Sequence, residues 1–106
     1  MRLQRFEIYW VDLNPTKGYE IAKKCPCVII SPNELHFLQT RLIAPITSKG
    51  FDAPFRVDFT LEGQKARILC DQIRCISTEH FLSKITTLED TKQEELLAIL
   101  AQMFMR

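Results

Sequence analysis

The alternation of apolar and polar residues between about residue 6 and residue 76 predicts a series of short strands. In two stretches, apolar or aromatic side chains recur at every second position, and in others a short apolar run is typical of a central strand. The expected strands are Phe6–Leu13, Cys27–Ile30, Arg41–Pro45, Phe55–Leu61, Ala66–Leu69 and Asp71–Ile76. Glu62-Gly63 is expected to be the turn between two of them. Up to six short strands with brief turns predict a compact antiparallel barrel or curled sheet.

The period of the pattern changes near the C-terminus. Apolar residues there recur at helical spacing, at Leu96, Ile99, Leu100 and Met103. They predict a helix from about Lys92 to Met105, and Thr91 to Glu94 has the sequence of a capping box. Single helical turns are expected over Pro32–Phe37, with Ser31 as the N-cap, and over Thr78–Leu82. The chain is therefore expected to be one mainly β domain over residues 1–106, with a C-terminal helix.

The composition limits the kinds of partner that the protein is expected to bind. The 106 residues are 46% hydrophobic and 25% charged, and the formal net charge is +1. Nucleic-acid binding would then need a local cluster of basic residues. No apolar run has the length of a secretory signal or of a membrane span, so we expect a cytoplasmic protein without membrane contact.

The four cysteines do not have the spacing of a zinc knuckle. Cys25 and Cys27 form C-x-C, and Cys70 and Cys75 form C-x4-C. We expect free thiols and neither a metal nor another cofactor.

A long polar loop between the first two strands is the first candidate for a functional site. It contains one acid, three lysines and a hydroxyl: Glu20, Lys17, Lys23, Lys24 and Thr16. Polar loops of about a dozen residues that are held by strands often carry binding or catalysis.

Five segments of the chain resemble the PemK/MazF family of toxin endoribonucleases. They are VDLNPTKGYE (11–20), PCVIISP (26–32), APITSKG (44–50), APFRV (53–57) and CDQIR (70–74), in this order and at these intervals. The resemblance implies an SH3-like barrel of the CcdB/PemK/MazF toxin type, with a C-terminal helix. It also implies a homodimer that cleaves single-stranded messenger RNA without a metal. A cognate antitoxin would cover the RNA groove, and operator DNA would be bound only through that antitoxin.

Such cleavage uses the neighbouring 2′-hydroxyl as nucleophile and leaves a 2′,3′-cyclic phosphate and a 5′-hydroxyl. The protein must supply a base, an acid, and donors for the charge on phosphorus. Glu20 is a candidate base, Lys23 and Lys24 supply positive charge, and the hydroxyls of Thr47 and Ser48 can donate to phosphate oxygens.

Further candidates complete the predicted site. Asp71 and Gln72 can bind a base or orient a partner, and Phe51 lies in a loop where it can stack on a base. Thr16, Lys17 and Lys49 are expected to contact RNA. Trp10 and Phe55, in contrast, are expected in the core, and neither His36 nor His80 has a partner at catalytic spacing.

One position departs from the family. Where its members generally carry a catalytic arginine before the proline of the second strand, this chain has Cys25, and a thiol cannot replace a guanidinium. Side-chain alternation along an extended strand places Lys23 on the face of Cys25 and Lys24 on the other. We therefore predict that Lys23 or Arg56 substitutes for the arginine, with a reduced rate.

Other interpretations stay open at this point. The loop charges can be a solvated surface, Thr47-Ser48 a turn cap, Asp71 a partner for backbone amides, and Arg56 a solvent-facing strand residue. For the whole protein, a gyrase-inhibiting toxin of the same fold and an antitoxin-binding homologue that is catalytically impaired are the alternatives. The segments 14–18 and 44–50 favour the ribonuclease.

Overall fold

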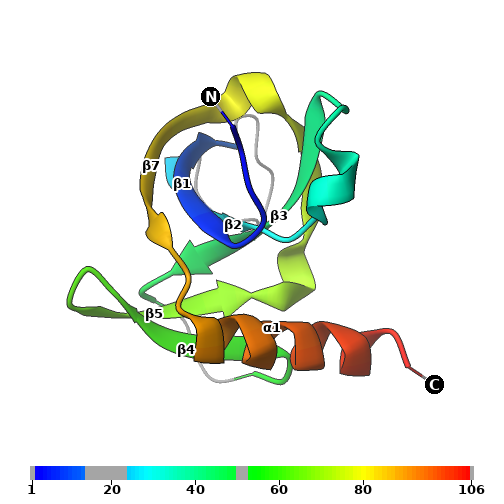
Figure 1. The fold of residues 1–106 in the computed structure, drawn as a ribbon. Helices are drawn as coiled ribbons and strands as arrows, with labels where there is room; N and C mark the ends of the chain where they lie inside the picture. The colour runs from blue at the N-terminus through cyan, green and yellow to red at the C-terminus, as the bar shows by residue number, and fades with distance from the viewer. Residues whose placement is uncertain (1, 14–23, 50–52, 106) are drawn as a thin grey trace.

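The computed structural model describes residues 2–13, 24–49 and 53–105. Its elements are β1 (Glu7–Asp12), β2 (Lys24–Ile29), β3 (Thr40–Thr47), β4 (Arg56–Leu61), β5 (Gln64–Leu69), β6 (Arg74–Ser77), β7 (Phe81–Thr87) and α1 (Asp90–Met103). Single 3-10 turns lie at Asn33–Leu35, Cys70–Gln72 and Thr78–His80. The strands form an antiparallel sheet in the order β4-β5-β3-β2-β1-β7, and β6 pairs with β3 beside this path. Figure 1 shows β1, β2, β3 and β7 curled into a barrel, with the β4–β5 hairpin and α1 below it.

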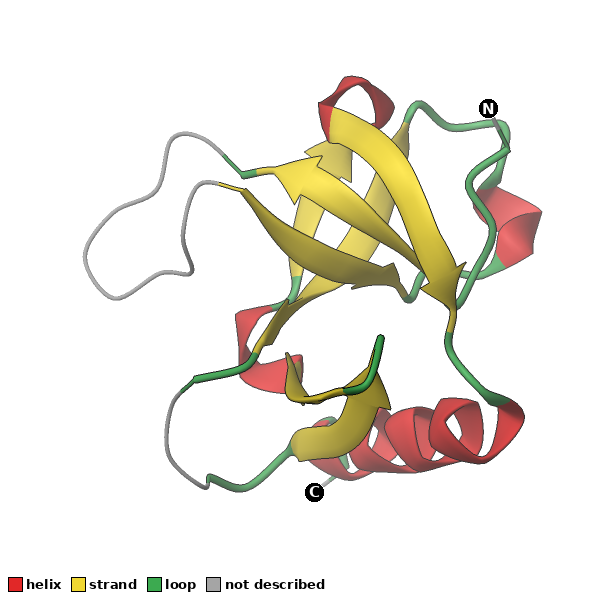
Figure 2. Ribbon diagram, turned by 90° about the vertical axis from the view of Figure 1, so that its left-hand side faces the viewer, coloured by secondary structure: helices red, strands yellow, loops and turns green. Residues whose placement is uncertain are grey.

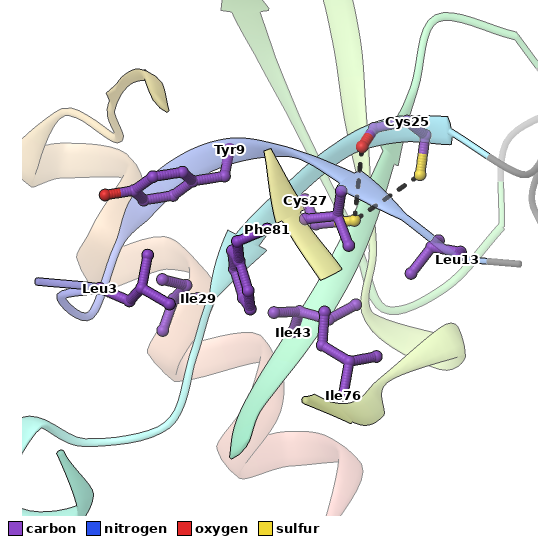
Figure 3. Close-up of a cluster of buried hydrophobic side chains, with 10 residues drawn as sticks. Leu3, Tyr9, Leu13, Cys25, Cys27, Ile29, Ile43, Ile76 and Phe81 are labelled. Atoms are coloured by element: carbon purple, nitrogen blue, oxygen red, sulfur yellow. Dashed lines mark hydrogen bonds between the residues drawn. The ribbon is translucent and has the colours of Figure 1, made fainter. Parts of the chain in front are cut away.

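The central strands are apolar on both faces because they separate two buried clusters. The barrel core contains Leu3, Tyr9, Val11, Leu13, Cys25, Cys27, Ile29, Ile43, Ile76 and Phe81 (Figure 3). The helix-side core contains Ile8, Val28, Ile30, Ala44, Ile46, Val57, Ile68, Cys70, Leu88 and Leu96. Successive residues of β2 thus enter opposite clusters, which explains why Cys27–Ile30 is a continuous apolar run.

The helix-side core also explains the C-terminal helix. Leu96 is fully buried in it, and Ile99, Leu100 and Met103 pack against it, so the predicted apolar stripe is confirmed. Figure 2 shows α1 lying along the hairpin, away from the barrel. The hairpin turn at Glu62-Gly63 is confirmed as well. Both residues have positive φ, 49° and 80°, as a two-residue turn between twisted strands requires.

The segment after residue 76 differs from the prediction. We expected a helical turn over Thr78–Leu82 and strands only up to about residue 76, but the 3-10 turn ends at His80 and Phe81 begins β7. Phe81 is buried in the barrel core, where its ring meets that of Tyr9 edge-on at 5.6 Å. The β1–β7 ladder contains two register shifts, and these bulges interrupt the period-two pattern that would have predicted a strand.

Both predicted helix caps are wrong. The Ser31 hydroxyl accepts a hydrogen bond from the Leu42 N–H at 3.2 Å, and Pro32 occupies the N-cap of the 3-10 turn instead. At α1, Glu89 is the N-cap without a side-chain bond, and the helix covers 90–103 instead of 92–105. Gln93 Nε2 donates to the Leu88 carbonyl at 2.7 Å, which ties the first turn back to the preceding strand connection.

The expected burial of Trp10 and Phe55 is also wrong, since 41% of each residue is exposed. Trp10 lies opposite Pro26 on β2, just beyond the end of the β2–β3 ladder. Within the described residues, no helix is both long and apolar enough to span a membrane.

Glu7 joins the N-terminal segment, β1 and β7. Its Oε1 accepts from the Gln4 N–H at 2.7 Å and from the Tyr9 hydroxyl at 3.2 Å, and its Oε2 pairs with Lys84 Nζ at 2.8 Å. Burial alone would raise the pKa of Glu7, but the bonds from Lys84, Gln4 and Tyr9 favour the charged form more strongly. The net effect lowers the pKa of Glu7 below its ordinary 4.5.

We expect this cluster to make stability dependent on acid. Because the folded pKa of Glu7 lies below the unfolded value, its contribution is complete above about pH 4.5 and is lost as pH falls through the folded pKa. Glu7→Gln should therefore lower the free energy of unfolding by about 1–2 kcal/mol at neutral pH. The difference from the unsubstituted chain should shrink in strong acid. Urea unfolding of both chains at neutral pH and in strong acid measures this difference in the free energy of unfolding.

Asp58→Asn is the matched control, because that carboxylate pairs with Arg67 at 2.8 Å but its side chain is 73% exposed. Its effect should be below about 1 kcal/mol at either pH. An equal loss for Glu7→Gln at neutral pH and in acid would contradict this role for the Glu7 carboxylate.

Candidate active site

A pocket of about 670 Å³ opens where the first residues of β2 meet the end of β3 and the β4–β5 hairpin. From β2 it is lined by Lys24, Cys25 and Pro26, and from β3 and the residues after it by Ile46, Thr47, Ser48 and Lys49. Glu62 and Lys65 border it from the hairpin, and Trp10 from β1. Segments that are far apart in the sequence therefore form one concave surface.

Pro45 explains why the pocket lies at this place. The ladder between β2 and β3 ends at the pair Cys27 and Pro45, and Pro45 has no N–H to donate. Beyond Pro45, β3 pairs with β5 through Ile46 and Thr47, while the start of β2 pairs only with β1. The two parts of the sheet diverge at this point, and the pocket lies between them.

The polar groups of the pocket suit an anion. Lys24, Lys49 and Lys65 contribute three positive charges and Glu62 one negative charge, and all four residues are exposed. The Thr47 Oγ1 accepts a hydrogen bond from the Lys49 N–H at 3.1 Å. Because the oxygen is the acceptor there, the hydroxyl hydrogen can be donated to a bound phosphate oxygen.

Cys25 borders the pocket but is only 5% exposed. Its sulfur lies 3.6 Å from that of Cys27, which is fully buried. A hydrogen bond from the Cys27 thiol lowers the pKa of Cys25, against the opposing effect of burial. The same contact, together with burial, raises the pKa of Cys27. The position at which the resemblance implies an arginine thus holds a buried thiol and no permanently charged donor.

The structure brings together part of the predicted site. Lys24, Cys25, Thr47, Ser48 and Lys49 all line the pocket. Strand alternation placed Lys24 on the face opposite Cys25, yet both border the pocket, because Lys24 is the first residue of β2 and the pocket lies beyond that strand end. Five further predicted residues fall outside the described residues: Thr16, Lys17, Glu20, Lys23 and Phe51.

Arg56 and Asp71 lie close to one another but do not line this pocket. Arg56 Nε and Nη2 reach Asp71 Oδ1 and Oδ2, each at 3.2 Å, in a two-bond ion pair. The Arg56 side chain is 14% exposed and that of Asp71 45%. Gln72 follows Asp71 in the 3-10 turn and is also outside the pocket.

Two contributions to the pocket could not be read from the sequence. Trp10 was assigned to the core by its period, and nothing in the sequence shows that Pro26 opposite it lies at an open edge. Lys65 lies on the β4–β5 hairpin, and it borders the pocket only because β5 pairs with the end of β3.

A second pocket of about 600 Å³ shares Thr47, Ser48 and Lys49 with the first and continues toward Arg67 and Lys92.

Comparison with known proteins identifies the class. Residues 4–104 match the family described as PemK-like, MazF-like toxin of type II toxin-antitoxin system, and the chain belongs to this family. The endoribonuclease MazF9 of Mycobacterium tuberculosis is 32% identical over 94 residues, which cover 78% of this chain and 80% of the relative.

Solved structures agree on the fold. MazF from Deinococcus radiodurans superimposes with a TM-score of 0.79 at 18% identity, covering 94% of each chain. An endoribonuclease in complex with its cognate antitoxin, from a mycobacterial species, gives a TM-score of 0.76 at 17% identity and covers 93% of this chain and 91% of its own. The predicted mainly β toxin fold with a C-terminal helix is confirmed.

Proposed function

We propose that this chain is the toxin of a type II toxin-antitoxin system and an endoribonuclease that cleaves single-stranded messenger RNA at selected sequences. Its family and the activity named for its relatives support this class. The observation that carries the proposal is the pocket, which gathers three lysines and the Thr47 and Ser48 hydroxyls in a chain whose net charge is only +1. Local positive charge is what a nearly neutral protein needs to bind a phosphate backbone.

The proposed reaction uses the RNA's own 2′-hydroxyl as nucleophile. A base removes its proton, the oxygen attacks phosphorus, and the 5′-oxygen leaves with a proton from an acid, giving a 2′,3′-cyclic phosphate and a 5′-hydroxyl. Lys24 and the Thr47 hydroxyl are proposed to stabilise the charge on the phosphoryl oxygens. Lys24 suits this role better than Arg56, because it borders the pocket and Arg56 is held by Asp71.

The remaining roles are proposed for residues of the segment before β2 and for residues from the end of β3 onward. Glu20 is proposed as the base and Lys23 as a second cation, with Thr16, Lys17 and Phe51 binding RNA beside Ser48 and Lys49. The nucleophile belongs to the substrate, so the proposed reaction needs no metal ion. Arg56, Asp71 and Gln72 are proposed to hold a neighbouring nucleotide.

We also propose a homodimer that binds a cognate antitoxin, through which alone it would reach operator DNA. The C-terminal end supports an apolar partner surface, since Phe104 is 75% and Met105 72% exposed. A related endoribonuclease has been solved in complex with its cognate antitoxin, which supports the same kind of partner for this chain.

The test is cleavage of a long single-stranded RNA by the purified chain in the presence of a chelator, with the new 5′-hydroxyl ends mapped. Cys25→Arg should speed cleavage about tenfold, because one additional charge-assisted hydrogen bond to phosphate contributes about 1.4 kcal/mol. Glu20→Ala should slow it. Cys75→Arg adds the same charge at an exposed cysteine outside the pocket and should leave the rate unchanged.

If Cys25→Arg adds nothing and Glu20→Ala removes nothing, the site assignment fails. A second candidate function, an antitoxin-binding homologue with little activity, is favoured by the sulfur at the arginine position. Tight antitoxin binding without RNA cleavage or growth arrest would select it. Inhibition of supercoiling without cleavage would select the gyrase-directed alternative.

A further inference from the structure

The wall of the pocket contains a pair of thiols in contact. Cys25 and Cys27 lie on the same face of β2, with their sulfur atoms 3.6 Å apart (Figure 3). The Cys27 sulfur is also within 3.7 Å of the Cys25 carbonyl oxygen as a donor, and the Cys25 sulfur accepts from the Ile46 backbone, so the two sulfurs touch one another within a shared set of backbone contacts. All four cysteines of the chain are free thiols.

The two sulfurs differ in accessibility and in charge. Cys25 borders the pocket, whereas Cys27 is fully buried behind it in the barrel core. The bond from the Cys27 thiol lowers the pKa of Cys25, which raises the fraction present as the reactive thiolate. An oxidant that enters the pocket would therefore meet Cys25 first, with a second thiol already in contact behind it.

We propose that Cys25 and Cys27 form a reversible peroxide-sensitive dithiol that changes the shape of the pocket. The Cys25 thiolate attacks hydrogen peroxide, the O–O bond breaks, and the products are a Cys25 sulfenic acid and hydroxide. The Cys27 sulfur then attacks the Cys25 sulfur, forming the S–S bond and releasing water, with its proton taken up by the leaving oxygen. A small thiol such as dithiothreitol returns both cysteines to thiols by exchange.

The strand can accommodate this bond at a local cost. Residues two apart on an extended strand have Cα atoms about 6.6 Å apart, at the long end of the disulfide range of about 4.4–6.8 Å. The sulfurs must close from 3.6 Å to about 2.05 Å, so β2 must bend at Pro26 between them. Pro26 has no N–H to lose, and the β2–β3 ladder begins only at Cys27, so the backbone bonds that oppose the bend are those on the β1 side, where Cys25 is paired with Val11 and Cys27 with Tyr9.

The bend has a consequence for the pocket. Lys24 directly precedes Cys25 and borders the same pocket, so closing the disulfide displaces its ammonium group relative to Thr47. This consequence rests on the proposed function. A displacement of about 1 Å in a positioning group can lower a rate by about 100-fold. We therefore expect the oxidised chain to cleave RNA at least about tenfold more slowly and dithiothreitol to restore the rate.

The first test needs no RNA, so its failure and that of the proposed function are distinguishable. The unsubstituted chain and a Cys75→Ser variant, which lacks the exposed thiol, are treated with one equivalent of hydrogen peroxide. They are then unfolded, alkylated, digested and analysed by mass spectrometry. The proposal predicts that Cys25 and Cys27 are blocked in one intrachain disulfide, that Cys70 is alkylated, and that dithiothreitol frees the blocked pair.

Two variants test whether the disulfide depends on Cys27 and not on another buried cysteine. In Cys27→Ala, Cys25 should stop at the sulfenic acid, which dimedone traps, and no intrachain disulfide should form. Cys70→Ala removes an equally buried cysteine and should leave the Cys25–Cys27 disulfide unchanged. Oxidation that reaches Cys70 or Cys75 while Cys25 stays alkylatable overturns the proposal. A Cys25–Cys27 disulfide that leaves the cleavage rate unchanged overturns its link to the pocket.

Discussion

Replacing Thr47 with valine is expected to lower the rate of RNA cleavage about 100-fold. Valine has nearly the shape of threonine, so the packing at the end of β3 is kept while the hydroxyl donor is lost. Because the Thr47 oxygen is already an acceptor for the Lys49 N–H, its hydrogen is the group available for a phosphoryl oxygen on which charge develops. The rate constant for a short RNA, measured with a chelator present, gives the size of the effect.

Two controls separate the hydroxyl from its surroundings. Thr47→Ser keeps the hydroxyl and should remain within a few-fold of the unsubstituted rate. Thr40→Val makes the same change at the opposite end of β3, where the exposed threonine borders neither pocket, and should leave the rate unchanged. Full activity in Thr47→Val would show that this hydroxyl does not contact the reacting phosphate.

The parts of the fold that were predicted correctly are those that local burial or local turn geometry determines. The run Cys27–Ile30 is apolar because β2 lies between the two cores, and the stripe from Leu96 to Met103 is apolar because one face of α1 covers the hairpin. The turn at Glu62-Gly63 follows from the glycine, which adopts positive φ freely, whereas Glu62 takes its φ of 49° at a steric cost. In each case the burial or the turn geometry that fixes the local structure also selects the residue types that form the sequence pattern.

The parts that were missed depend on contacts between segments far apart in the sequence. β7 pairs with β1 through two bulges, so its side chains do not alternate regularly. The position of the pocket depends on where β3 stops pairing with β2 and begins to pair with β5. This change of partner brings Lys65 and Lys24 to the same pocket, and their positions in the sequence do not indicate it. The ion pair between Arg56 and Asp71, which lies outside the pocket, is likewise not indicated by the spacing of the two residues.

Arg41 shows most clearly what a linear pattern cannot contain. It begins a stretch that is predicted as an ordinary apolar strand. Arg41 is nevertheless only 7% exposed, and its guanidinium donates to three backbone carbonyls. These belong to Leu3 at 3.2 Å, Leu38 at 2.9 Å and Thr40 at 2.8 Å. One side chain thereby ties the N-terminal segment and the connection before β3 to the barrel.

We expect Arg41→Met to lower the free energy of unfolding by about 3 kcal/mol, the second large effect predicted for this chain. Methionine fills most of the space of the arginine stem, so the loss comes mainly from three carbonyls that no longer receive a charged donor. Arg41→Lys should be intermediate, because one ammonium group cannot take the places of both Nε, which donates to Leu3, and Nη1, which donates to Leu38 and Thr40. Urea or thermal unfolding measures the series.

Arg67→Met is the matched control for this prediction. It makes the same chemical change on a strand of the same sheet, but Arg67 pairs with an exposed Asp58 side chain at 2.8 Å, where water can replace the bond. Its cost should stay below about 1 kcal/mol. If Arg41→Met is no more destabilising than Arg67→Met, the three carbonyls find other donors and the guanidinium is not what fixes the N-terminal segment. If the predicted difference is found, burial of the donor and not its charge accounts for it, because both substitutions remove one positive charge.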